Sequence, residues 1–221
     1  MRAKGYAAAA LIVLAACGPS GEPAKGQGTA APAGWKSPTK FDIAGVSLGD
    51  SVASATAALK QRGFTVAVSN GAFSFEDWVR KSQAAAKGQD PMPKLDGVRD
   101  LTARKGAEQI YLPVRAFPDG GIIESITYSV PSNGRSQGEM IAAVKARYPA
   151  GWQPRPAMFR LCAKGDPDCT RSLPQGNYVQ FDPGVTAFSI RLFAGRQQQL
   201  EFRAAFDAEL RKRVGPTPSS F

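Results

Sequence analysis

Residues 108–131 read EQIYLPVRAFPDGGIIESITYSVP, and this stretch decides the class of fold. Apolar and polar side chains alternate on both sides of the sequence PDGG at 118–121. A period of two is typical of strands with one buried face, and PDGG is typical of a turn. We therefore expect two consecutive strands, with Glu124 breaking the pattern, after a less regular strand at 98–105. Their shared apolar face is expected to contain Ile110, Leu112, Val114, Ala116, Ile122, Ile126, Tyr128 and Val130.

The residues before these strands predict two helices in succession. Asp50 or Ser51 is suited to cap the first helix, because short polar side chains accept hydrogen bonds from the first backbone amides of a helix. Ser74 and Asp77 have the spacing of a capping box, which indicates the start of the second helix. Helical spacing places Trp78 of this second helix on its inward face.

The second half of the chain predicts a similar order of elements. Ser136 and Glu139 form another capping-box pattern, followed by an apolar helical stripe. The residues at 151–175 are expected to be irregular, in the place where a second helix could have stood. Strands are expected at 178–182 and 185–193, where apolar residues alternate again.

The segment at 197–212 fits two structures. Leu200, Phe202, Ala204 and Phe206 alternate as in a strand, whereas Phe202, Phe206 and Leu210 have helical spacing. We expect a strand to about Phe206 and a short helix after it, because this would complete a second meander.

The order of elements resembles a known α+β fold, the tandem helix-then-antiparallel-sheet unit of the beta-lactamase inhibitor protein. Single copies occur in the SmpA/OmlA family, small outer-membrane lipoproteins of the barrel assembly machinery. The similarity rests on the sequence GVSLG at 45–49, the helix that follows it, and the order of strands. It implies two units, 41–131 and 132–213, as one compact domain or two fused halves. Residues 214–221 are expected to form a disordered tail. The resemblance also implies binding of proteins through sheet faces and loops, without enzymatic activity.

The amino-terminal residues resemble the signal peptide of a bacterial lipoprotein. Arg2 and Lys4 precede an apolar segment at 6–16, which is shorter than the roughly 20 residues that span a bilayer. This segment ends in Leu-Ala-Ala directly before Cys17, which is the pattern of a lipobox. The resemblance implies that residues 1–16 are removed and that the thiol of Cys17 carries a diacylglyceryl group.

The residues that follow the lipobox indicate a membrane-anchored protein with a flexible tether. Gly18 stands where an Asp would retain a lipoprotein at the inner membrane, so the resemblance implies the periplasmic side of the outer membrane. Residues 17–40 are rich in Gly, Pro and Ala, a composition that buries too little apolar surface to fold. Such a tether has an average span of roughly 25–30 Å.

The chain has three cysteines, and an odd number in an exported protein requires an explanation. Lipidation accounts for Cys17. Cys162 and Cys169 have six residues between them and are expected to form a disulfide in the oxidising periplasm. A zinc site is disfavoured because there are too few thiols, and a redox pair because the spacing is not Cys-x-x-Cys.

The formal net charge of the whole chain is +10, and it falls to +8 without residues 1–16, which contain two cations and no carboxylate. A basic exported protein meets anionic lipid headgroups, acidic polysaccharides or acidic protein surfaces. No sequence motif indicates nucleic-acid binding. We expect the membrane and another envelope protein as partners.

The chain contains no histidine, which excludes Ser-His and Cys-His nucleophile systems and the commonest metal ligand. We expect no catalytic residue, no cofactor and no metal. Asp166 and Asp168 could contribute to a calcium site, but two carboxylates are few for calcium, and a turn explains them better. A carboxylate-dependent hydrolase is the least favoured of the functions considered.

The candidate binding residues lie in the expected irregular segment: Trp152, Arg155, Arg160 and Lys164. Trp and Arg are enriched at binding hot spots, although a buried Trp152 fits the sequence equally well. The favoured function is a non-enzymatic protein-binding or scaffold module of the cell envelope. The alternative is a periplasmic inhibitor of a hydrolase.

Overall fold

The fold is α+β, as the sequence predicts, with helices packed against an antiparallel sheet. The lipobox, the tether and Lys164 lie outside the described residues, as do the last six residues of the chain. The computed structural model describes residues 41–147, 152–155, 158–162, 166, 168–184 and 186–215.

The elements follow one another in two series along the chain. The first contains α1 (Val52–Gln61), β1 (Thr65–Ala72), α2 (Phe75–Ala85), β2 (Gly97–Lys105), β3 (Glu108–Arg115), β4 (Ile122–Ile123) and β5 (Ser125–Pro131). The second contains α3 (Gln137–Arg147), β6 (Trp152–Arg155), β7 (Met158–Cys162), β8 (Tyr178–Asp182), β9 (Ala187–Phe193) and α4 (Arg196–Val214). A short 3-10 turn at Pro118–Gly120 joins β3 to β4.

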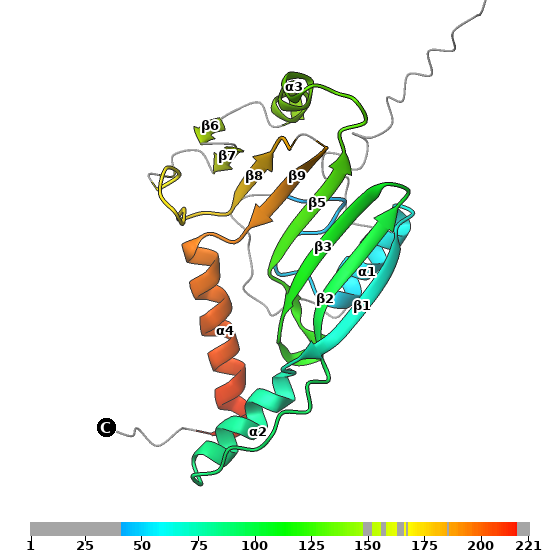
Figure 1. Ribbon diagram of the computed structural model, residues 1–221. Coiled ribbons are helices and arrows are strands. Elements are labelled where there is room, and N and C mark those ends of the chain that lie inside the picture. The colour runs from blue at the N-terminus through cyan, green and yellow to red at the C-terminus, as the bar shows by residue number, and fades with distance from the viewer. Residues whose placement is uncertain are drawn as a thin grey trace, which may run out of the picture.

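One continuous sheet runs through both series (Figure 1). Its strands lie in the order β1-β2-β3-β5-β9-β8-β7-β6, all neighbours are antiparallel, and β4 pairs with β3 beside this path. The last strands of the two series, β5 and β9, meet in the middle. Their register places buried side chains opposite one another: Ile126 and Leu192, Tyr128 and Ile190, Val130 and Phe188.

Helix α1 begins at Ser51, which resolves the choice between two caps. The Ser51 hydroxyl accepts the backbone N–H of Ser54 at 3.1 Å, whereas the Asp50 carboxylate accepts that of Ser47 at 2.8 Å. Ala55 and Leu59 are fully buried on one face of the helix. Figure 1 shows α1 behind β1 and β2, so this apolar face covers one side of the sheet.

Helix α2 begins with the expected capping box. The Ser74 hydroxyl accepts the N–H of Asp77, and the Asp77 carboxylate accepts the N–H of Ser74, both at 3.2 Å. The prediction for Trp78 is only partly right, because this residue is 39% exposed. Its ring lies 5.2 Å from that of Phe73 and 6.0 Å from that of Phe206, so it packs at the molecular surface.

Strand β1 corrects the prediction of two helices in succession. It lies between α1 and α2, and it forms one edge of the sheet by pairing with β2 alone. The register shifts between Ser69 and Asn70 and again before Ala72. An edge strand with irregular pairing buries few side chains, so its alternation in the sequence is faint.

The segment expected to be irregular contains β6 and β7. Pro154 lies in β6, opposite Phe159 of β7. Proline lacks an N–H donor and therefore argues against a central strand, but it is tolerated at the edge of a sheet. Strand β6 is such an edge, and only the tertiary arrangement shows it.

Helix α4 corrects the expectation of a strand up to Phe206. Gln198 and Phe202 are buried and Phe206 is half-buried, at intervals of four residues along one helical face. Gly195 lies in front of the helix, where a Cβ atom would come within 2.0 Å of the carbonyl oxygen of Gly176. The close approach of Gly195 to Gly176 and the burial of Phe202 favour the helix over the strand. Both depend on residues that are distant in the chain, so the sequence of the segment alone does not reveal them.

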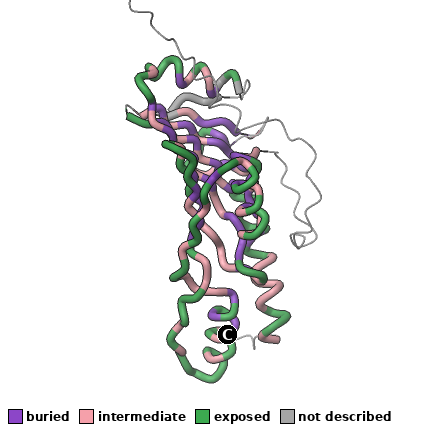
Figure 2. Tube along the Cα trace, turned by 90° about the vertical axis from the view of Figure 1, so that its right-hand side faces the viewer, coloured by how far each residue is buried: buried purple, intermediate pink, exposed green. Residues whose placement is uncertain are grey.

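The main hydrophobic core draws on both series of elements. It includes Leu59 of α1, Ile110 of β3, Val144 of α3, Leu192 of β9 and Phe202 of α4. Figure 2 shows the buried positions gathered along the strands at the centre of the molecule. The expected capping box of α3 is also present, since the Ser136 N–H donates to the Glu139 carboxylate at 2.7 Å.

Candidate interaction surface

Residues that alternate with the core positions form the second face of the sheet, which we call the open face. Strand register places ten of them in two rows, and none is buried. The central row consists of Thr102, Tyr111, Thr127, Arg191 and Gln180, on β2, β3, β5, β9 and β8. The second row consists of Arg104, Gln109, Ser129, Ser189 and Asp182 on the same strands.

The open face is the side of β1, β2 and β3 that looks toward the viewer in Figure 1, away from α1. Neighbouring strands lie about 4.8 Å apart, so each row crosses roughly 19 Å. Tyr111 is 41% exposed near one end of the central row, and Arg191 is half-buried near the other. The rows offer hydroxyl, amide and guanidinium groups, which can form hydrogen bonds with a partner.

A disulfide-bonded loop covers one end of the open face. Cys162 and Cys169 form a disulfide with their Cα atoms 5.8 Å apart. Strand register continues the open face from Cys162 through Tyr178 to Phe193. The disulfide, the Tyr178 and Phe193 rings, and Leu173 form a second, smaller hydrophobic cluster. Asp166 and residues 168–177, which together we call the disulfide loop, therefore pack on the face opposite the main core.

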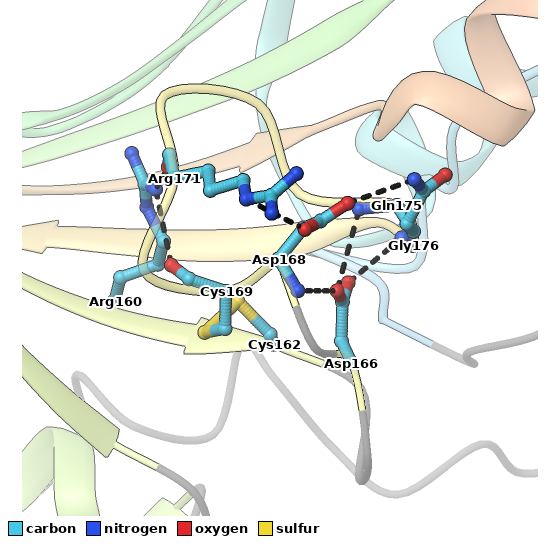
Figure 3. Close-up of a disulfide and its surroundings, with 8 residues drawn as sticks. All are labelled: Arg160, Cys162, Asp166, Asp168, Cys169, Arg171, Gln175 and Gly176. Atoms are coloured by element: carbon cyan, nitrogen blue, oxygen red, sulfur yellow. Dashed lines mark hydrogen bonds and ion pairs between the residues drawn. A yellow bond between two sulfur atoms is a disulfide. The ribbon is translucent and has the colours of Figure 1, made fainter.

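Two carboxylates stabilise the disulfide loop from within (Figure 3). Asp166 accepts the backbone N–H groups of Asp168 and Gly176, each at 2.9 Å. Asp168 forms an ion pair with Arg171 at 3.0 Å and accepts a hydrogen bond from the Gln175 amide at 2.8 Å. These contacts agree with the turn interpretation of both aspartates. No group of three or more metal-ligating side chains occurs among the described residues.

Arg160 also serves the disulfide loop. Its guanidinium donates to the carbonyl oxygens of Cys169 and Arg171 and lies 4.8 Å from the centre of the Tyr178 ring. The residue is only 8% exposed. Arg160 therefore holds the loop against the sheet instead of presenting its charge to a partner.

Strand pairing places the segment with Trp152 and Arg155 next to Arg160, because Gln153 lies opposite Arg160. Trp152 and Arg155 belong to β6, which is an edge of the sheet, and Lys164 lies outside the described part of the chain. The resemblance implies binding through a sheet face, but the residues of the open face were not among the predicted binding residues, which were chosen as Trp, Arg and Lys in a segment expected to be a loop. The alternation at 108–131 contains the signal of the open face, since polar residues there lie opposite the apolar ones.

Ionisable groups beside the open face keep fixed charge states near neutral pH. Burial by itself would raise the pKa of Asp100, but hydrogen bonds from Arg99 and Ser69 hold it below the ordinary value. Burial raises the pKa of the Tyr178 hydroxyl, and the nearby Arg160 only partly opposes this. Asp100 is therefore charged and Tyr178 neutral near pH 7, although both are buried and neither presents its polar group to a partner.

Comparison of the chain with models of protein families, with curated proteins and with solved structures finds no match. Among the described helices, none has the length and apolar character needed to cross a membrane.

Proposed function

We propose that this chain is a lipid-anchored protein of the bacterial envelope that binds another envelope protein and catalyses no reaction. The contact surface is the open face together with the disulfide loop beside it. The observation that carries the proposal is the pair of polar rows, ten residues that cross five strands without one of them being buried.

The composition of the open face suits a protein partner. Tyr and Arg are enriched at binding hot spots, and Tyr111 and Arg191 lie in the same row, with Thr127 between them. A sheet restricts the backbone of these residues before binding, which lowers the entropy lost on association. The disulfide loop is similarly held by its covalent link and its internal hydrogen bonds.

The resemblance to the beta-lactamase inhibitor protein fold extends this proposal to two repeated units. Each series of elements contains a helix followed by four strands of the main sheet, β1-β2-β3-β5 and β6-β7-β8-β9. The strand order is mirrored about the β5–β9 pair. In this interpretation α2 is an insertion after the first strand of one unit, and the disulfide loop is an insertion in the other.

The proposed location rests on the lipobox and the tether. A diacylglyceryl group on Cys17 would hold the protein in the periplasmic leaflet of the outer membrane, since each buried CH₂ contributes about 0.8 kcal/mol. The tether at 17–40 would allow the folded part to turn its open face toward a partner.

Site-specific crosslinking in cells tests the proposed surface. A photoreactive amino acid at Thr127 would probe the open face, and one at exposed Lys60 on α1 would serve as the control. We expect one dominant protein adduct from the Thr127 position and none from the Lys60 position. The same adducts from both positions, or none from either, would contradict the proposal.

Variants of the same face provide the quantitative test. Tyr111→Ala combined with Arg191→Glu is expected to reduce recovery of the crosslinked partner at least tenfold, as for loss of a hot spot. Lys60→Glu changes charge on the far side and should leave recovery intact. Thermal unfolding of each variant shows whether the fold is retained.

A further inference from the structure

A cleft lies at the end of the sheet, remote from the rows of the open face. It has a volume of about 280 Å³ and is formed by the start of α2, the start of β2, the turn at Pro118–Gly120 and the end of α4. Figure 1 shows α2 and the end of α4 side by side below the sheet, and the Gln83 amide donates to the carbonyl oxygen of Arg213 at 3.5 Å.

Three phenylalanines line the cleft: Phe73 is half-buried, whereas Phe75 and Phe117 are buried in the packing beneath it. Phe206 of α4 holds two of them in place, with its ring 5.5 Å from that of Phe75 and 6.2 Å from that of Phe117. Phe75 and Phe117 therefore belong to the packing between α2, α4 and the sheet, and Phe73 is the ring that a ligand in the cleft could reach.

Three carboxylates also line the cleft, although the chain as a whole has a net charge of +10. Glu76 forms a 3.4 Å ion pair with Arg213. Asp96 and Asp119 form no ion pair with a described residue and accept no hydrogen bond from one. With Arg213 as its one lining cation among described residues, the cleft keeps a formal charge of −2.

The chain itself shows what kind of group this cleft accommodates. The guanidinium of Arg213 already lies at the rim beside Glu76, in a pair whose side chains are 57% and 65% exposed. Lys81 does not line the cleft, but its ammonium lies 5.9 Å from the centre of the Phe73 ring, so this ring already accepts one cation. Of the cations in the described part of the chain, Arg213 alone lines the cleft. A planar guanidinium can stack on an aromatic face while its edge donates to carboxylates.

We infer that the cleft is a binding site for a guanidinium group carried on an apolar stem, with Asp96 and Asp119 as its acceptors and Phe73 as the stacking surface. The group could come from an arginine of a polypeptide or from a small free guanidine, since the cleft would recognise the same chemistry in both. Arg213 acts as an internal competitor for Glu76. This site is separate from the open face, so either one can fail without the other.

Titration of the intact chain in detergent tests the inference. The probes are the capped peptide acetyl-Gly-Arg-Gly-amide, the same peptide with uncharged citrulline in place of arginine, and the monocation N-butylguanidinium, with binding followed by NMR or calorimetry at low salt. We expect the arginine peptide and butylguanidinium to bind and the citrulline peptide to bind at least fivefold more weakly. Tighter binding of the peptide would assign the site to a polypeptide, and equal or tighter binding of butylguanidinium would assign it to a free guanidine.

Variants with matched controls locate the binding. Asp96→Asn with Asp119→Asn should weaken binding about fivefold, whereas Glu201→Gln on α4 removes a distant exposed carboxylate and should not. Arg213→Gln should strengthen binding about twofold or more because it releases Glu76, and Arg211→Gln on the same helix should have no such effect.

Three results would overturn the inference. These are the absence of binding by both cations at millimolar concentration, equal binding of the arginine and citrulline peptides, and identical effects of the cleft variants and their controls. Thermal unfolding of every variant excludes loss of fold as the cause.

Discussion

The buried carboxylate of Asp77 accepts the backbone N–H of Lys94, 17 residues further along the chain, at 2.9 Å. It also accepts the N–H of Leu95 at 3.3 Å and forms an ion pair with Arg80. Asp77, which forms the capping box of α2 with Ser74, thereby also stabilises the loop that follows this helix. The backbone of Leu95 has a left-handed conformation with φ of 56°, which is uncommon for residues other than glycine.

Replacement of Asp77 is the first prediction. Asp77→Asn keeps the size of the side chain but removes the charge that these donors share, so we expect a loss of about 2–3 kcal/mol in the free energy of unfolding. Urea denaturation measures it. The control is Ser74→Ala, which removes only the cap and should cost about 1 kcal/mol. Equal losses in the two variants would contradict a central role for the Asp77 carboxylate.

The pH dependence of stability is the second prediction. Burial alone would raise the pKa of Asp77, but N–H donors from Lys94 and Ser74 hold it below the ordinary 3.8. Stabilisation by this group is therefore present above pH 3.8 and is lost as the pH falls through the lowered value in the folded protein. We expect Asp77→Asn to flatten the acid limb of stability measured against pH. An unchanged acid limb would show that other carboxylates control it.

Loss of the disulfide is the third prediction. Cys162→Ser with Cys169→Ser should destabilise the protein by about 2.5 kcal/mol, because the bond closes a short loop with a sequence separation of 7. Chemical denaturation of the oxidised protein and of the double variant measures this difference. Thiol labelling of the oxidised protein should find neither cysteine. A labelled pair in protein kept under oxidising conditions would contradict this connection.

Close packing at Gly195 gives the fourth prediction. Gly195→Ala should cost several kcal/mol and loosen α4, because the new Cβ would lie 2.0 Å from the Gly176 oxygen. Hydrogen exchange of α4 amides and thermal unfolding would report it. Gly138→Ala in α3 is the matched control, since its Cβ would meet nothing closer than 3.9 Å. The control should be neutral or stabilising by up to about 1 kcal/mol.

Membrane attachment is the fifth prediction. Cys17→Ala should give an uncleaved precursor without lipid, which keeps its apolar segment at 6–16. Mass spectrometry should find a diacylglyceryl-modified Cys17 as the first residue of the wild type, and residues 1–16 still attached to the variant. An unmodified Cys17 in the wild type, or the same amino-terminal processing in both proteins, would refute the lipobox interpretation.

The sequence by itself determined the α+β class, the capping boxes at Ser74 and Ser136, and the central strands. The caps depend on residues close together in the chain. The strands β3, β5 and β9 bury one face so regularly that the alternation is plain, whereas β2 was expected as a less regular strand. The candidate open face is the polar half of the same alternation. The alternation identifies these polar residues, but the sequence alone does not show whether helices or loops cover the face on which they lie.

The tertiary structure alone decided the edges, the end of the chain and the cleft. β1 has no buried side chain, and β1 and β6 are edge strands that each pair with a single neighbour. The apolar residues at 197–212 fit the alternation of a strand as well as the spacing of a helix. This segment became α4 because Phe202 reaches the shared core and Gly195 permits the backbone to pass Gly176. The cleft joins Phe73, Asp119 and Arg213, which meet only because α4 folds back beside α2.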